Sequence, residues 1–227
     1  MTIATNREGT VEGRGDDQRR PLLRGYLHLG AAIAAALGLV LLVLLADSPK
    51  AYVGGVIFAI SLIALYTVSG IYHSVRWGPR MGAVLKRLDH AMIFVMIAGG
   101  YTPFCLFAGS PAWGISLLAV VWSIAGAGVA LKIAWPNAPR WLSVALYLGA
   151  GWIALVAATK ITDWYAIGPL LVLALGGVLY SIGGVIYGLR RPNPFPRVFG
   201  YHEVFHTLVI AGSVLHYGVV AAYLMPA

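Results

Sequence analysis

Seven apolar runs make up most of the 227-residue chain and limit the folds open to it. Each run has about 19 to 27 residues, close to the roughly 20 that an α-helix needs to cross about 30 Å of hydrocarbon. The runs are residues 25–46, 51–75, 88–108, 112–133, 141–159, 166–189 and 198–224. Short stretches separate them, and all of these except residues 160–165 contain proline, which ends helices because it lacks an N–H. The pattern predicts an all-α integral membrane protein, a bundle of seven transmembrane helices.

The composition excludes a water-soluble domain. Hydrophobic residues make up 59% of the chain and charged residues 11%, whereas a soluble domain carries about 25% charged residues. The single cysteine, Cys105, excludes an intramolecular disulfide framework and a multi-cysteine metal site. The net charge of +8 does not indicate nucleic-acid binding, because the basic residues lie in short clusters between apolar runs.

The distribution of charge predicts the domains and the orientation. Residues 1–24 are polar and mixed in charge, which is typical of a disordered tail, and residues 25–227 form the predicted seven-helix transmembrane domain. Of the 16 Lys and Arg residues, only Lys50 and Lys160 fall outside the tail and the connections after the second, fourth and sixth runs. Because cytoplasmic segments carry the excess of Lys and Arg, we expect a cytoplasmic N-terminus.

Ionisable residues within the apolar runs mark candidate sites, because a charge in a bilayer is costly unless it is paired. His73 lies near the end of the second run, Asp89 near the start of the third, and His202 and His206 open the seventh. All four are expected near the cytoplasmic side. His202 and His206 are four residues apart and so share one face of a helix, and Ser69 lies one turn before His73. The positions predict one shared site.

Three imidazoles at one point suit Zn²⁺, which favours nitrogen and sulfur ligands and keeps an open fourth position in catalytic sites. Bound Zn²⁺ lowers the pKa of a water from its ordinary value toward about 7, which supplies hydroxide. Asp89 is then placed to hold or deprotonate that water. Ser69 has two interpretations: a hydrogen bond to the water or to a substrate carbonyl, or one to a carbonyl a turn back in its own helix.

Each residue also has a simpler interpretation when it is taken singly. His73 would extend to the headgroups, and Asp89 would cap a helix or pair with Lys86 or Arg87. Agreement in depth between three separate runs favours the shared site over these alternatives.

The seventh run also contains a H-E-x-x-H pattern at residues 202–206, in which Glu203 would be the base of a metalloprotease. Five residues are weakly specific, and Glu203 has the alternative role of a carboxylate at the membrane interface. His90 is expected to face a neighbouring helix or the headgroups. His216 lies too far along the helix to join the site, and His28 is expected to extend to the membrane surface.

The order Ser69-x-x-x-His73, Asp89 in the next run and His202-x-x-x-His206 in the last resembles the haemolysin III proteins. They are the bacterial branch of the progestin and adiponectin receptor family, in a superfamily that includes alkaline ceramidases. The resemblance covers residues 25–224. It implies a seven-helix protein of the bacterial inner membrane, multi-pass, with zinc held at the cytoplasmic side. The implied ligands are His73, His202 and His206, with Asp89 holding the metal water and Ser69 lining the site.

Three functions follow from these expectations. The first is a zinc-dependent hydrolase of a lipid amide or ester, with a membrane lipid as the substrate. The alternative is a non-catalytic sensor or regulator of the membrane in which zinc is structural. The third, a pore or ion pathway, needs ionisable groups at several depths, and the centre of the predicted bundle is nearly bare of them. The sequence does not indicate the oligomeric state.

Overall fold

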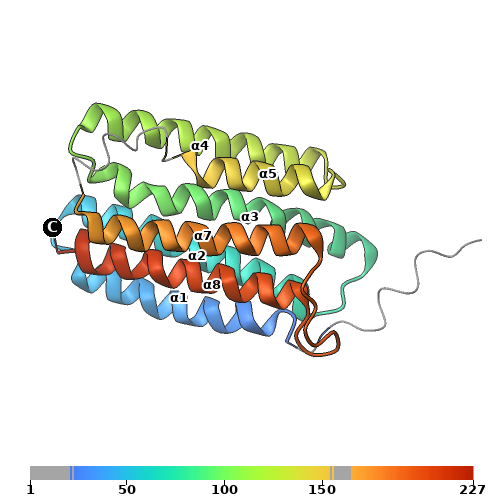
Figure 1. The fold of residues 1–227 in the computed structure, drawn as a ribbon. Coiled ribbons are helices and arrows are strands. Elements are labelled where there is room, and N and C mark those ends of the chain that lie inside the picture. Colours follow the sequence, from blue (N-terminus) through green and yellow to red (C-terminus); the bar gives the residue numbers. More distant parts are fainter. Residues whose placement is uncertain (1–20, 22, 154, 156–164, 227) are drawn as a thin grey trace, which may run out of the picture.

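The computed structural model describes residues 21, 23–153, 155 and 165–226, which form a bundle of roughly aligned helices (Figure 1). The described α-helices are α1 (Tyr26–Leu45), α2 (Pro49–Ser74), α3 (Pro79–Leu106), α4 (Pro111–Ala134), α5 (Arg140–Gly151), α7 (Ile167–Leu189) and α8 (Tyr201–Val219). A π-helical turn, η2 (Val220–Leu224), continues α8. The predicted all-α bundle is confirmed. Most of the predicted tail, residues 1–20 and 22, lies outside the described residues.

Three helices begin at a proline. Pro49, Pro79 and Pro111 are the first residues of α2, α3 and α4. Proline suits this position because the first N–H groups of a helix have no partner within the helix and the proline ring fixes a helical φ. At α2 the Ser48 hydroxyl also accepts a hydrogen bond from the Ala51 N–H at 3.2 Å. The prolines that separate the apolar runs therefore start helices as well as ending them.

Helix α3 begins nine residues before the apolar run that predicted it, at Pro79 and not at Leu88. Hydropathy detects the part of a helix that suits hydrocarbon, and the first turns of α3 carry Arg80, Lys86 and other polar residues. Asp89 therefore lies well inside a continuous helix, so the alternative role of Asp89 as a helix cap is wrong.

Helix α5 covers the first part of the fifth predicted run. It extends over 12 residues, while residue 154 and residues 156–159 of that run lie outside the described part of the chain. The other predicted runs agree with α1, α2, α4, α7 and α8 to within a few residues at each end.

The bundle has the surface of a membrane protein. Five of the described helices, α1, α2, α4, α7 and α8 with η2, are long and apolar enough to cross a membrane. Large apolar side chains face outward, for example Leu37 at 68% exposure and Leu44 at 76%, as hydrocarbon around the bundle allows. The chain is therefore a multi-pass membrane protein.

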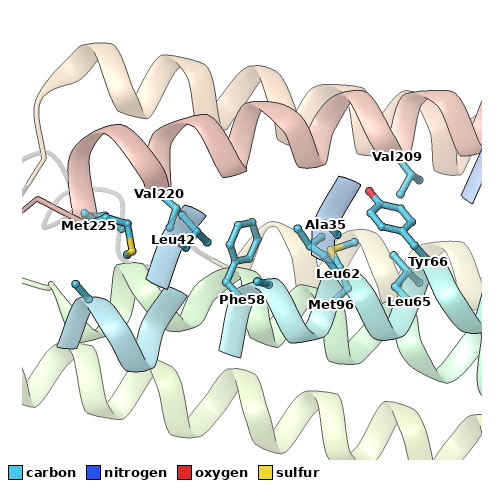
Figure 2. Close-up of a cluster of buried hydrophobic side chains, with 13 residues drawn as sticks. Ala35, Leu42, Phe58, Leu62, Leu65, Tyr66, Met96, Val209, Val220 and Met225 are labelled. Carbon is cyan, nitrogen blue, oxygen red and sulfur yellow. The ribbon is translucent and has the colours of Figure 1, made fainter. Parts of the chain in front are cut away.

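Helix α2 lies at the centre of the main apolar core. Figure 2 shows this core, in which Phe58 and Leu62 of α2 meet Leu42 of α1, Met96 of α3 and Val220 of η2. A second cluster joins α3, α4 and α5 through Phe94, Val121 and Ala150. Helix α3 contributes to both clusters and so connects the two parts of the bundle.

Hydroxyl groups connect helices inside the bundle. The Tyr66 hydroxyl of α2 donates to Ser213 Oγ of α8 at 2.6 Å, and the Tyr180 hydroxyl of α7 lies 2.9 Å from the same oxygen. Such bonds stabilise membrane bundles because lipid offers no alternative partner.

One end of the bundle carries nearly all the described positive charge, and we call it the basic end. It is the right-hand end in Figure 1, where α1, α3, α5 and α8 begin and α2, α4 and α7 end. Its described cations are Arg24, Arg76, Arg80, Lys86, Arg87, Lys132, Arg140, Arg190, Arg191 and Arg197. This is the end that the charge bias predicts to be cytoplasmic.

Two adjacent glycines of α3 test the close contact between α2 and α3. A Cβ on Gly99 would overlap the Ser61 side chain of α2, whereas a Cβ on Gly100 would meet no atom of another segment within 4 Å. We expect Gly99→Ala to cost about 1–3 kcal/mol through overpacking, only partly offset by about 1 kcal/mol of helix propensity. Thermal unfolding in detergent should show a lower Tm for Gly99→Ala and an equal or higher Tm for Gly100→Ala. Equal Tm values would contradict the packing described.

Candidate metal centre

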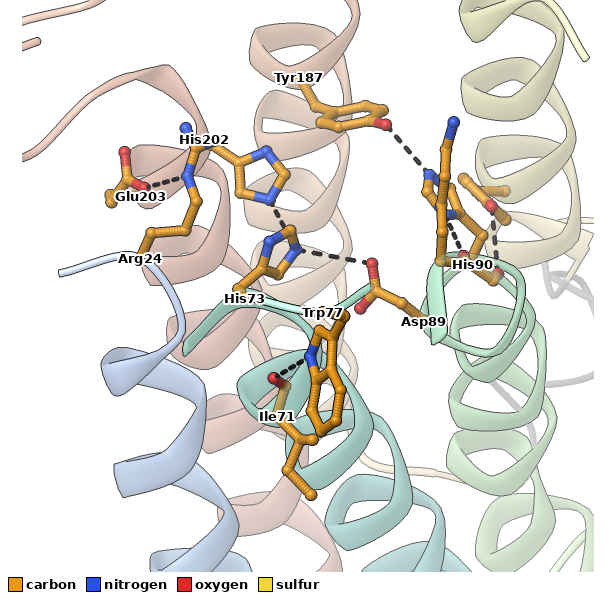
Figure 3. A network of polar contacts seen from close by, with 11 residues as sticks. Arg24, Ile71, His73, Trp77, Asp89, His90, Tyr187, His202 and Glu203 are labelled. Atoms are coloured by element: carbon orange, nitrogen blue, oxygen red, sulfur yellow. Dashed lines mark hydrogen bonds and ion pairs between the residues drawn. The ribbon is translucent and has the colours of Figure 1, made fainter. Parts of the chain in front are cut away.

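Three imidazoles from two helices meet at the basic end, and Figure 3 shows two of them, His73 and His202. His73 is the second-last residue of α2, and His202 and His206 lie on one face of the first two turns of α8. His202 Nε2 lies 3.2 Å from His73 Nε2. One nitrogen of each of the three rings lies within 4.8 Å of the others. The structure thus brings together the three histidines that the spacing predicted to share a site.

The geometry of this group fits a tetrahedral metal in part. Two nitrogens bound to one Zn²⁺ at 2.0–2.1 Å lie about 3.3 Å apart, which the 3.2 Å between His73 and His202 matches. The widest separation, up to 4.8 Å, is larger than a bound ion would allow. The three ring planes meet at 60° to 69°, which is compatible with three rings around one ion. His206 is 1% exposed, and its Nδ1 has no hydrogen-bond partner among the described residues.

Asp89 and Ser69 lie beside the histidines. Asp89 Oδ2 is 3.6 Å from His73 Nε2, the same nitrogen that faces His202. Ser69 is buried one turn before His73 on α2, close to the Asp89 carboxylate. A nitrogen pair and a carboxylate therefore face one small region. The sequence predicted both residues near the site, where the structure has them.

Glu203 points away from His73 and His202 (Figure 3). Its Oε1 accepts a hydrogen bond from Arg24 Nε at 2.9 Å, and its Oε2 accepts one from the Gly200 N–H at 2.7 Å. The carboxylate caps the first turn of α8 and is fully buried. The geometry therefore disfavours the metalloprotease interpretation, because the proposed base is occupied by structural hydrogen bonds outside the group.

His28 is a fourth imidazole at the basic end, and its predicted extension to the membrane surface is wrong. It is 3% exposed, and its ring stacks on that of His206, with centroids 3.7 Å apart and planes 13° apart. Parallel stacked rings cannot both point at one ion, so this arrangement does not make His28 a further ligand. It packs on a face of His206 and fixes the orientation of that ring. Its apolar neighbours Leu27 and Leu29 give no indication of this contact, which depends on how α1 lies against α8.

The other two histidines lie outside the group. His90 Nδ1 lies 2.7 Å from the Lys86 carbonyl oxygen, and His90 Nε2 lies 3.2 Å from the Tyr187 hydroxyl of α7. The expectation that His90 faces a neighbouring helix is confirmed. His216 Nδ1 lies 2.9 Å from the Gly212 carbonyl oxygen of its own helix, ten residues beyond His206.

Comparison with known proteins identifies the family of this chain. The family described as haemolysin-III related matches residues 17–217. Hemolysin-3 homolog of Bacillus subtilis (strain 168) is 34% identical over 167 residues, 74% of this chain and 75% of that protein. Hemolysin-3 of Bacillus cereus is 30% identical over 211 residues, 92% and 93% of the two chains. The adiponectin receptor protein of Drosophila melanogaster is 28% identical over 183 residues, 73% of this chain and 40% of that protein.

The fold and the grouped histidines define a class, the multi-pass helical membrane proteins with a candidate metal centre at one end of the bundle. Within that class, the chain belongs to the haemolysin III family. Its similarity to an adiponectin receptor agrees with the wider family that the Ser69, His73, Asp89 and His202-x-x-x-His206 pattern resembles.

The structural role of Glu203 can be tested by substitution. Glu203→Gln removes the charge that Arg24 contacts, and we expect a loss of about 1.5–3 kcal/mol because hydrogen bonds to charged groups contribute that much. Arg24→Gln should lower the Tm similarly. Arg80→Gln, at an exposed position of the same end, is the control and should leave the Tm nearly unchanged. If Glu203→Gln is as stable as the wild type, Glu203 is not a structural group and becomes a candidate base again.

Proposed function

We propose that the protein is a zinc-dependent hydrolase of a lipid amide or ester in the cytoplasmic membrane of a bacterium. The observation that carries the proposal is the meeting of His73, His202 and His206 within 4.8 Å, with the Asp89 carboxylate 3.6 Å from His73. A hydrolase needs a group that activates water and a group that takes its proton, and this arrangement offers both.

The donor set favours zinc. Three neutral imidazoles with no cysteine nearby suit Zn²⁺ better than Mg²⁺ or Ca²⁺, which prefer oxygen ligands. When bound, zinc would supply an activated water and polarise a substrate carbonyl. His73, His202 and His206 would hold the ion, and the stacked His28 ring would keep His206 in its orientation.

Asp89 and Ser69 would act next to the ion. The Asp89 carboxylate is placed to accept a proton from the attacking water and to orient that water during attack. The Ser69 hydroxyl is close enough to help orient the carboxylate, and the position of Asp89 within the continuous helix α3 limits its movement. This assigns Ser69 a positioning role, alongside the predicted contact with the substrate carbonyl.

The position of the site favours a lipid substrate. Trp77 and Trp141 are exposed at the basic end, and tryptophan gathers at the headgroup level of membranes. A site at this level is close to the amide or ester linkage of a lipid whose acyl chains remain in hydrocarbon.

The alternative function is a membrane sensor or regulator with structural zinc. The observation that favours it is that the group joins α2 to α8, with a carboxylate from α3 at ion-pair distance. A closed site of three histidines and Asp89 would clamp these helices without leaving a position for substrate.

Metal content tests the ligand assignment. The wild type purified in detergent should contain about one zinc per chain. His206→Ala should lose most of this zinc, because the two remaining imidazoles, of His73 and His202, bind it weakly. His216→Ala removes an imidazole from the same helix at a position outside the group and should retain the metal. The measurement is elemental analysis of monodisperse protein. Zinc that is unchanged in His206→Ala would refute the site.

A measurement of lipid hydrolysis distinguishes the hydrolase from the sensor or regulator. We expect the wild type to hydrolyse some members of a panel of labelled lipid amides and esters, and a chelator to stop it. Asp89→Asn should keep its zinc and lose at least about 100-fold in rate, the usual contribution of a general base. A zinc-loaded wild type that cleaves no lipid in the panel would favour the regulator.

A further inference from the structure

A second polar group lies at the basic end, between α3, α4, α5 and α7, and we call it the basic cluster. It consists of Lys86, Lys132, Arg140, Ser143, Tyr147 and Tyr187. It is separate from the three imidazoles and has no part in the proposed hydrolysis.

Lys132 is buried in the basic cluster, and none of the described acidic residues pairs with it. Its side chain lies in the last turn of α4 and is 3% exposed. Nζ donates a hydrogen bond to Ser143 Oγ of α5 and lies 5.4 Å from the centre of the Tyr147 ring. A hydroxyl and an aromatic face lower the cost of burying an ammonium group, but they do not neutralise its charge.

Arg140 adds a second charge to the basic cluster. Its Cζ lies 5.0 Å from the centre of the Tyr187 ring, and its buried Nη1 has no hydrogen-bond partner among the described residues. It is the first residue of α5, whose first turn has no acidic residue, although the positive end of a helix dipole favours an anion. Lys86 of α3 is close enough to repel Lys132.

The described carboxylates all lie outside the basic cluster. Among the residues that the structure describes they are Asp47, at the opposite end of the bundle, Asp89, which faces His73, and Glu203, which pairs with Arg24. The basic cluster therefore gathers two or three cations in a partly buried place where no described anion compensates them. Buried charges in proteins are normally paired, so the expected partner is a ligand.

We propose that the basic cluster binds a phosphate group, carried by an anionic phospholipid or present as free phosphate. Basic groups between membrane helices on the cytoplasmic side suit lipid headgroups, and the planar guanidinium of Arg140 and the ammonium of Lys132 suit phosphate oxygens. The Tyr187 ring separates this place from the three imidazoles, because its other neighbour is His202, with ring centroids 5.7 Å apart. A phosphate bound here lies beside the candidate metal centre and outside it.

Lipid binding to the full-length protein in detergent tests the proposal. Native mass spectrometry should show phosphatidylglycerol retained more strongly than phosphatidylcholine, whose phosphate carries a compensating cation. Lys132→Gln and Arg140→Gln should each weaken phosphatidylglycerol binding about tenfold, since each removes a charge-assisted contact. Lys132→Arg keeps the charge and should retain binding. The measurement needs no zinc and no turnover, so it stands or falls independently of the proposed hydrolase.

Matched variants distinguish phosphatidylglycerol binding at the basic cluster from a general attraction of anionic lipid to the basic end. Arg80→Gln removes an exposed charge at the same end and should leave binding unchanged. An equal loss in Arg80→Gln, or full binding by folded Lys132→Gln and Arg140→Gln, would overturn the proposal. If Lys132→Gln does not fold, the comparison of Arg140→Gln with Arg80→Gln decides the question.

Two further measurements identify the source of the phosphate. Inorganic phosphate that displaces phosphatidylglycerol and raises the Tm of the wild type, but not that of Arg140→Gln, assigns free phosphate as a ligand. Displacement by other lipids alone assigns the headgroup. The tail carries four acidic residues, Glu8, Glu12, Asp16 and Asp17. If their neutralisation tightens phosphatidylglycerol binding in the wild type but not in Arg140→Gln, the tail competes with the lipid phosphate for the basic cluster, which supports the proposal.

Discussion

The absence of water from hydrocarbon is the constraint on which the rest of the structure depends, because each polar group in the bundle must find its partner within the protein. Helices satisfy the backbone, and pairs such as Tyr66 with Ser213 satisfy hydroxyls between helices. Among the described residues, the buried side-chain polar atoms without a hydrogen-bond partner all belong to residues of the basic end: His28, Ser74, Arg87, Arg140 and His206. The unpaired atoms are thus concentrated where a ligand or ion can satisfy them.

Helix α3 connects the two polar groups of the basic end. Asp89 faces His73 in the candidate metal centre, and the next residue, His90, contacts Tyr187 at the edge of the basic cluster. Successive residues on a helix point about 100° apart, so one turn of α3 serves two sites. The Tyr187 ring completes the connection, since it lies between Arg140 and His202.

Hydropathy and the positions of Lys and Arg predicted the order of the described helices and most of their ends, because these depend on local composition. The grouping of His73, Asp89, His202 and His206 was predictable for the same reason, since depth in a membrane can be counted along the chain. The stack of His28 on His206 and the pairing of Arg24 with Glu203 were not predictable. Both depend on the side of α8 that α1 approaches, which is set by the packing of apolar side chains across the bundle.

The N-terminal extension of α3 was also not predictable from the hydropathy pattern. Its first nine residues are helical although they include the charged residues Arg80, Lys86 and Arg87, and a pattern that measures affinity for hydrocarbon does not detect such a segment. The consequence for Asp89 is an interior helical position, which local residue preferences did not favour.

The three histidines and the carboxylate lie on parts of helices that differ in rigidity. His73 lies in the last turn of α2 and His202 in the first turn of α8, where helices fray, while Asp89 lies deep inside α3. The Trp77 indole N–H donates a hydrogen bond to the Ile71 carbonyl oxygen at the end of α2, and Glu203 caps α8. These contacts hold both helix ends in place. Metal binding should therefore slow amide hydrogen exchange at the C-terminus of α2 and at the N-terminus of α8. The interior of α3, which holds Asp89 in a fixed position, should change little.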